Sequence, residues 1–162
     1  MMEPVYYGLS EPYQLYQHVT FVCEMLGHGK HNMAVNMLME TAAVETHSGQ
    51  MSDRHVLSHG VGVFQMDRIG FDDVQARVRN EDRVAVLEAT GFDVYTVQYE
   101  WLAASPLLAA IFCRLFYKLK PEVFPVDREK RAEYWKTHYN TQAGKGSAGH
   151  YLMCCSHFGV NV

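Results

Sequence analysis

Apolar residues recur at helical spacing along most of the chain, and glycine or proline interrupts each run. In the first run they return every three or four positions, at Leu15, Val19, Val22 and Leu26. This spacing places them on one face of a helix, and Gly27-His28-Gly29 directly afterwards predicts its end.

The second apolar run has the same period but ends in a carboxylate. Its stripe consists of Ala34, Leu38, Ala42 and Glu45. These positions share one helix face, so Glu45 is expected to lie beside the core at the helix end. Asn32 is expected to cap the start of this helix.

The remaining pattern is also mostly helical. We expect helices over Phe71–Arg79, Asp82–Ala89, Leu107–Leu119 after Pro106, Arg128–Tyr139 after a capping Asp127, and Ser147–Cys155. Val94–Gln98 alternates weakly and is the one predicted strand. With no linker and no internal repeat, the sequence predicts a single, mainly α domain over residues 1–162 with little or no β-structure.

Charge and hydropathy exclude several classes of partner. The net charge is -4 and no basic cluster occurs, which argues against nucleic acid as the main partner. The longest apolar run, Leu102–Cys113, is too short to span a bilayer and contains Ser105 and Pro106. The first residues lack the charged and apolar regions of a signal peptide.

Cysteine and histidine patterns give no metal motif. Cys23, Cys113, Cys154 and Cys155 have no zinc-binding spacing, and we expect reduced thiols. His47, His55 and His59 lie close in sequence, but without an HExxH arrangement. We therefore expect no metal and no cofactor, and keep a histidine-based metal-binding regulator as a minor alternative.

Glu45 is the main candidate for catalysis. A carboxyl group that lies against a core loses hydration, so its pKa should rise, which suits a general acid near neutral pH. It also lies at the helix end whose dipole disfavours a negative charge. The alternative is an ordinary solvated or salt-bridged glutamate at a helix end.

A glycine-bearing segment follows, Gly60-Val61-Gly62-Val63-Phe64-Gln65-Met66-Asp67. Its glycines allow positive φ or a close backbone approach to a ligand. If the segment is extended, Gln65 and Asp67 point to one side and Phe64 and Met66 to the core. A polar wall beside Glu45 would suit sugar hydroxyls and amides; the alternative is a glycine turn before a short strand.

The stretch Glu45-Thr46-His47-Ser48-Gly49 with Gly60–Asp67 resembles the catalytic core of goose-type lysozymes and lytic transglycosylases. That family carries Glu-Ser-His-x-Gly, a loop, and Gly-x-Gly-Leu-Met-Gln-x-Asp; here Thr46 replaces the serine and Val63-Phe64 replace Leu-Met. The resemblance makes Glu45 the catalytic acid and assigns substrate binding to Gly62, Phe64 and Gln65. Asp67 and Asp53 become the candidates for a second carboxylate.

A downstream stretch, Tyr134–Leu152, resembles the family's Tyr-Asn motif at Tyr139-Asn140. In the family these residues face the glutamate across the cleft, which makes them substrate-binding candidates. The family continues directly with Ala-Gly, whereas here Thr141-Gln142 intervene. Trp135 and Tyr139 at helical spacing also fit a core position, and Asn140 fits a helix cap.

The resemblance implies a lysozyme-like domain that cleaves the β-1,4 bond between N-acetylmuramic acid and N-acetylglucosamine in peptidoglycan. A transglycosylase needs Glu45 alone as acid and base; a lysozyme also needs a water-holding carboxylate. We favour the transglycosylase because only Glu45 is placed as an acid–base group.

Peptidoglycan lies outside the cytoplasmic membrane, so the missing export signal favours a bacteriophage enzyme. It would be carried on the virion tail or baseplate, bound to their proteins, or released from the host cytoplasm as an endolysin. An inactive lysozyme-like virion protein is the structural alternative.

Overall fold

The computed structural model describes residues 4–52, 60–140 and 146–160, which form a mainly α-helical single domain. Seven α-helices occur in them: α1 (Tyr13–Leu26), α2 (Ala34–Thr46), α3 (Arg68–Arg77), α4 (Asn80–Thr90), α5 (Pro106–Lys118), α6 (Arg128–Trp135) and α7 (Ala148–His157). A 3-10 helix, η1 (Tyr99–Ala103), precedes α5, and one π-helical turn, η2 (Lys136–Asn140), continues α6. Among these residues the only β-structure is an isolated bridge between Val61 and Met66.

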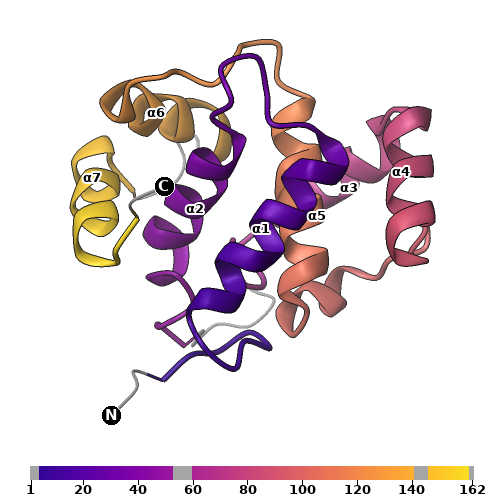
Figure 1. Ribbon diagram of the computed structural model, residues 1–162, viewed down its shortest axis with the longest axis horizontal. Helices are drawn as coiled ribbons and strands as arrows, with labels where there is room; N and C mark the ends of the chain where they lie inside the picture. Colours follow the sequence, from indigo (N-terminus) through magenta and orange to yellow (C-terminus); the bar gives the residue numbers. More distant parts are fainter. Residues whose placement is uncertain (1–3, 53–59, 141–145, 161–162) are drawn as a thin grey trace.

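Helix α2 occupies a central place in the fold (Figure 1). Helices α6 and α7 lie on one side of it, and α1 and α5 lie on the other, with α3 and α4 beyond them. The predicted stripe of α1 is buried, as are Ala34, Leu38 and Ala42 of α2. The hydrophobic periodicity therefore identified the inward faces of both helices correctly.

Several predicted helix boundaries are confirmed by their caps. Pro106 stands in the first turn of α5, and the Ser105 hydroxyl accepts a hydrogen bond from the Leu108 amide. Asp127 caps α6 through the Glu129 amide. The predicted Asn32 cap is wrong, because α2 begins at Ala34 after Met33, and Asn32 has a left-handed φ of 58°.

Helix α3 begins three residues earlier than predicted, at Arg68. The Asp67 carboxylate accepts a hydrogen bond from the Gly70 amide at 2.6 Å and so stabilises the first turn. Phe116 packs closely against Gly70 inside this helix. A Cβ atom at position 70 would lie 3.2 Å from the Phe116 ring, so glycine leaves room for this contact.

The predicted strand at Val94–Gln98 is wrong, and this segment forms a turn that leads into η1. The Gln75 side-chain amide donates hydrogen bonds to the carbonyls of Val94 and Val97, at 3.0 and 2.9 Å. These carbonyls are thus satisfied by a side chain from α3, and the segment needs no neighbouring strand.

A fully buried carboxylate, Glu40, ties α2 to α6 and α7. Arg131 donates to both of its oxygens at 2.8 Å, Arg128 donates at 2.9 Å, and the Tyr151 hydroxyl donates at 2.7 Å. A buried carboxylate is tolerated when it is paired and hydrogen-bonded in this way. The cluster fixes α6 against α2 one turn before Glu45.

All four cysteines are free and buried, so no disulfide crosslinks the domain. In the part of the chain that the structure describes, no helix has the length and apolar content needed to cross a bilayer.

Candidate functional site

Glu45 lies in the last turn of α2, where its carboxylate meets α6. The Trp135 indole N–H donates a hydrogen bond to Glu45 Oε2 at 3.0 Å. Trp135 is itself buried, so the expected core role holds, and the same ring also orients Glu45. The Glu40–Arg131 and Glu45–Trp135 contacts follow in the same order along α2 and α6, so one helix pairing sets both.

Burial raises the pKa of Glu45 from 4.5 to about 8. The Trp135 hydrogen bond opposes this rise because it stabilises the carboxylate, and the nearby Asp67 charge adds to it. The carboxyl group therefore holds its proton at neutral pH. This is the protonation state that a general acid requires.

The segment from Val61 to Met66 is a tight turn and not the extended segment considered above; of the two alternatives, the glycine turn is closer, although no strand follows it. The amides and carbonyls of Val61 and Met66 pair with each other at 3.0 and 3.2 Å. Gln65 adopts a left-handed φ of 49°. This reversal gives the orientation that an extended strand was expected to give: Phe64 and Met66 are buried, and Gln65 and Asp67 line a cavity.

The two glycines of this turn serve close packing within the protein. A Cβ atom on Gly62, whose φ is 79°, would lie 2.3 Å from the Leu102 carbonyl oxygen. A Cβ atom on Gly60 would lie 2.3 Å from the Gln65 carbonyl oxygen. Both positions therefore require glycine for close backbone contact, and the Gly62 carbonyl also accepts hydrogen bonds from the backbone and side-chain amides of Gln65, both at 3.0 Å.

Hydroxyl groups from three elements hold the carbonyls of the turn. Thr46, at the end of α2, donates to Val63 at 2.7 Å; Tyr139, in η2, donates to Phe64 at 2.6 Å; and Tyr99, in η1, donates to Met66 at 2.8 Å. These bonds connect Thr46 and Tyr139, which are 93 positions apart in the numbering, through one short turn. They set the position of the turn relative to Glu45.

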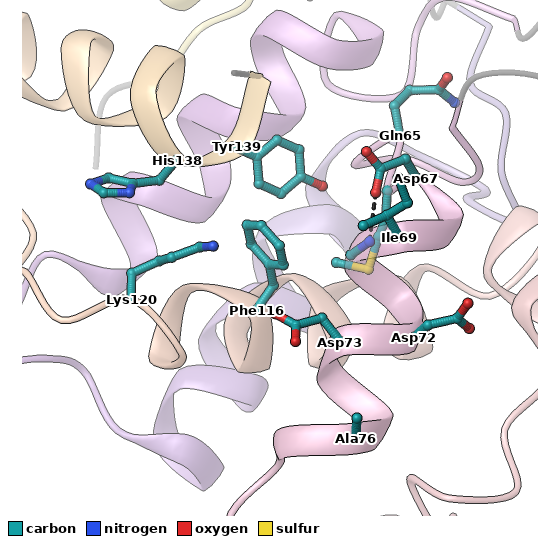
Figure 2. Close-up of a pocket in the computed structure, with 12 residues that line it drawn as sticks. Gln65, Asp67, Ile69, Asp72, Asp73, Ala76, Phe116, Lys120, His138 and Tyr139 are labelled. Carbon is teal, nitrogen blue, oxygen red and sulfur yellow. Dashed lines mark hydrogen bonds between the residues drawn. The ribbon is translucent and has the colours of Figure 1, made fainter. Parts of the chain in front are cut away.

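A cavity of about 510 Å³ opens beside the turn (Figure 2). Gln65, Asp67, Phe116, Lys120 and Tyr139 are among the residues that line it. In Figure 2 the Tyr139 hydroxyl points toward Asp67, and the Lys120 amine lies on the opposite side. The cavity thus combines an aromatic wall with carboxylate, amide and ammonium groups, a mixture typical of sites for polar organic ligands.

Glu45 does not line this cavity directly, but the two are electrostatically linked. Asp67 lines the cavity, and its charge raises the pKa of Glu45. Burial, followed by the nearby Cys113 and Glu45, raises the pKa of the Tyr139 hydroxyl well above its ordinary value. Asp67 and Tyr139 therefore couple the cavity electrostatically to Glu45.

Of the other predicted site residues that the structure describes, Phe64 and Asn140 do not line this cavity. Phe64 is buried, and the structure shows its carbonyl bonded to Tyr139. Asn140 ends η2 and accepts a hydrogen bond from the Lys136 amine at 2.7 Å. Its amide nitrogen lies beside Gly146, 3.3 Å from where a Cβ atom would stand. Asp53 lies outside the described residues.

Sequence reasoning missed the residues that hold Glu45 and the turn. Trp135 is 90 residues from Glu45, and no local pattern distinguishes a core tryptophan from one that also donates to a carboxylate. In the sequence Thr46 was noted only because it replaces the serine of the family motif. In the structure its hydroxyl bonds the 61–66 turn to α2. Lys120 and His138 line the cavity and carried no sequence signal at all.

Comparisons of the chain with protein-family models, with curated proteins and with solved structures found no match. Among the described residues, no group of three or more histidine, cysteine, aspartate or glutamate side chains is arranged to hold a metal ion. His55 and His59 lie outside those residues. The geometry of Glu45 and its surroundings is therefore what indicates a function for this protein.

Proposed function

We propose that this protein is a peptidoglycan-cleaving glycosidase with a lysozyme-like fold, in which Glu45 is the general acid. The observation that carries the proposal is the Glu45 carboxyl group, with its pKa raised to about 8 and its position fixed by Trp135. A structural glutamate offers a clear contrast on the same helix: Glu40 is paired with two arginines, whereas Glu45 accepts from an uncharged indole and remains half-buried.

In the proposed reaction, protonated Glu45 gives its proton to the glycosidic oxygen while the bond between that oxygen and C1 of N-acetylmuramic acid breaks. Glu45 is then a carboxylate and accepts a proton from the incoming nucleophile. In the transglycosylase reaction that nucleophile is the 6-hydroxyl of the same muramic acid, and a 1,6-anhydro product forms. Glu45 is protonated again at the end of the reaction, so the proton balance closes.

The cavity beside the turn is the proposed substrate cleft; Glu45 is not among its lining residues, so the proposal requires the glycosidic bond to extend beyond the cavity to meet the Glu45 carboxyl group. Gln65, whose amide nitrogen donates to the Gly62 carbonyl at 3.0 Å, and Tyr139, with its ring in the wall, would contact the sugar. Asn140 is proposed to contact the substrate from the end of η2, where Lys136 orients its side chain.

Hydrolysis by a lysozyme mechanism is the second candidate, and Asp67 is the observation that favours it. Its carboxylate is exposed, lines the cavity and is close enough to influence Glu45. Its Oδ1 atom already accepts the Gly70 amide, so its first role is to cap α3. We favour the transglycosylase, because that mechanism needs no second carboxylate.

The test is digestion of purified peptidoglycan with the wild-type protein and with Glu45→Gln, followed by mass spectrometry of the products. We expect 1,6-anhydro muropeptides from the wild type and a loss of turnover of about 10²–10⁴-fold in the variant. Reducing muramic ends would indicate a lysozyme. An inactive wild type would favour a structural lysozyme-like protein, and an active Glu45→Gln protein would refute the assignment of the acid.

The biological setting belongs to the same proposal. A muralytic enzyme of this kind fits a bacteriophage, either on the virion tail or baseplate or as an endolysin. Its partner would be the glycan strand of peptidoglycan.

A further inference from the structure

Five cationic side chains from distant parts of the chain line a second hollow, of about 370 Å³. They come from the loop between α1 and α2, the junction of α3 and α4, the last turns of α5 and the segment after it: Lys30, Arg79, Arg114, Lys118 and Lys120. One carboxylate, that of Glu122, lines the hollow as well. The fold thus gathers a basic site in a chain whose net charge is -4 and whose sequence has no basic run.

The positive charge of this hollow is only partly balanced. Of the five cations, Lys118 alone forms an ion pair among the described residues, with Asp82 at 2.7 Å. In the same part of the chain, Glu122 Oε2 lies 3.3 Å from His138 Nε2 and pairs with none of the five cations. An excess of positive charge therefore remains, and a hollow lined by charge of one sign attracts ions of the other.

Arg114 is the unusual residue of the hollow, because it is a buried cation without a carboxylate partner. It is 5% exposed, and burial lowers the pKa of its guanidinium, which nearby groups such as Asp82 only partly offset. Its Nε donates to the Gly27 carbonyl at 3.0 Å, and its guanidinium carbon lies 5.4 Å from the centroid of the Phe124 ring.

The two terminal nitrogens of Arg114 remain open to the hollow. Neither Nη1 nor Nη2 makes a hydrogen bond to the described residues, and neither is enclosed by protein. Buried charged groups are normally paired and hydrogen-bonded, because an unpaired one costs free energy. Two parallel N–H groups are thus available to an anion that enters the hollow.

The alternative is that these cations only close the end of α1. Arg114 donates to Gly27, and the Lys118 amine donates to the Leu26 carbonyl at 2.9 Å, so both satisfy carbonyls that the helix leaves unpaired. This role accounts for one N–H of Arg114 and for Lys118. It leaves the Nη1 and Nη2 groups unexplained, and it does not require positive charge at Lys30 or Arg79.

We propose that this hollow binds a phosphate group, as inorganic phosphate or as the phosphate of a small ester. A phosphate ester carries a charge of about -1.5 to -2 at pH 7 and three acceptor oxygens, whereas a carboxylate carries a single charge and two oxygens. Arg114 Nη1 and Nη2 would hold two of the phosphate oxygens in a bidentate manner, and Lys30 and Arg79 would balance the remaining charge from the rim.

The phosphate site is separate from the cavity beside the 61–66 turn, with which it shares Lys120 alone. Its chemistry does not depend on peptidoglycan cleavage. A hollow of about 370 Å³ holds a phosphate and a small organic group, so the expected ligand is a small molecule. The buried rings of Tyr117 and Phe124 are among the lining side chains and offer apolar contact to the organic part of an ester.

The experiment is an NMR titration of the full chain with inorganic phosphate and, separately, with glycerol 3-phosphate, at constant pH and ionic strength and with backbone amides assigned. We expect saturable shifts at Gly29, Lys118 and Lys120, which line the hollow, and no saturable shifts with sodium chloride. Binding of the ester at least as tight as that of inorganic phosphate would identify a small phosphate ester as the ligand. Binding of inorganic phosphate alone would identify the free ion.

Two pairs of substitutions give the decisive comparison. Lys30→Gln with Arg79→Gln removes two exposed cations from the rim and should weaken phosphate binding about tenfold. Lys130→Gln with Arg77→Gln removes the same two residue types from exposed positions outside the hollow, and should change binding by less than about twofold because salt screens distant charges. Arg114→Lys keeps the charge but loses the planar pair of N–H groups, and should weaken binding at least about tenfold.

Shifts that rise linearly with phosphate, or that sodium chloride reproduces, would overturn the proposal, because they would indicate screening of surface charge only. Equal binding by the wild type and the rim variant would also overturn it. So would equal losses in the rim variant and its control, since binding would then follow total charge. If Arg114→Lys does not fold, the rim comparison decides; if it folds and binds phosphate as the wild type does, the proposal is refuted.

Discussion

Replacing Glu45 with glutamine should make the stability difference between the two proteins depend on pH. The substitution keeps the shape of the side chain and an oxygen that can accept the Trp135 hydrogen bond, but it removes the ionisable group. In the wild type the pKa of Glu45 rises from 4.5 in the unfolded chain to about 8 in the folded protein. The folded state therefore binds this proton more tightly than the unfolded state.

The sign and size of this stability difference follow from proton linkage. The contribution of protonated Glu45 is fully present below pH 4.5 and is lost as the pH rises through about 8. One pKa unit corresponds to about 1.36 kcal/mol, so the rise sets an upper limit of about 5 kcal/mol. Because Glu45 is half-buried and keeps some contact with solvent, we expect about 2 kcal/mol. Glu45→Gln should thus match the wild type near pH 4 and exceed its stability by about 2 kcal/mol near pH 9.

The assay is urea unfolding of both proteins at a series of pH values from 4 to 9. All other titrating groups are shared, so their contributions cancel in the difference between the two curves. Glu40→Gln is the matched control on the same helix. Because Glu40 is paired with Arg128 and Arg131, its loss should destabilise the protein at neutral pH by roughly 3–5 kcal/mol.

A stability difference between Glu45→Gln and the wild type that does not change with pH would refute the reasoning. So would a variant that is less stable than the wild type at pH 9, because Glu45 would then be stabilised as a carboxylate. Either result would also remove the basis for Glu45 as an acid at neutral pH.

The remaining predictions concern the neighbours of Glu45. Trp135→Phe removes the hydrogen bond that lowers the pKa of Glu45, so the alkaline limb of the activity profile should move to higher pH; a limb that moves down would contradict this. Asp67→Asn keeps the cap of α3 but removes a charge that raises this pKa, so the limb should move to lower pH at unchanged melting temperature. Turnover should then fall modestly in a transglycosylase and severely in a lysozyme. Tyr139→Phe frees the carbonyl of residue 64 and should cost about 1–3 kcal/mol in urea unfolding, with faster amide exchange in the 61–66 turn; unchanged exchange would show that the hydroxyl does not hold the turn. Asn140→Ala should lower turnover with little change in melting temperature, and full activity would return this residue to a structural role.

Local sequence determined most of the helices, because their formation depends on spacing that is visible within a few turns. The stripes of α1 and α2, Pro106 at the start of α5 and Asp127 before α6 were all readable in this way. Glu45 was also identified locally, since a carboxylate that ends an apolar stripe must lie close to a core. The pattern at Val94–Gln98 failed because a side chain from α3, Gln75, bonds the carbonyls there, and nothing in the segment itself indicates this.

The sequence by itself determined which residues face the core and that Glu45 lies at the edge of it. Tertiary structure alone decided what surrounds Glu45: the Trp135 indole, the Asp67 charge and the turn held by hydroxyls from α2, η1 and η2. Desolvation and hydrogen bonding depend on atoms brought together from distant positions in the sequence, which are 90 residues apart in the Glu45–Trp135 pair.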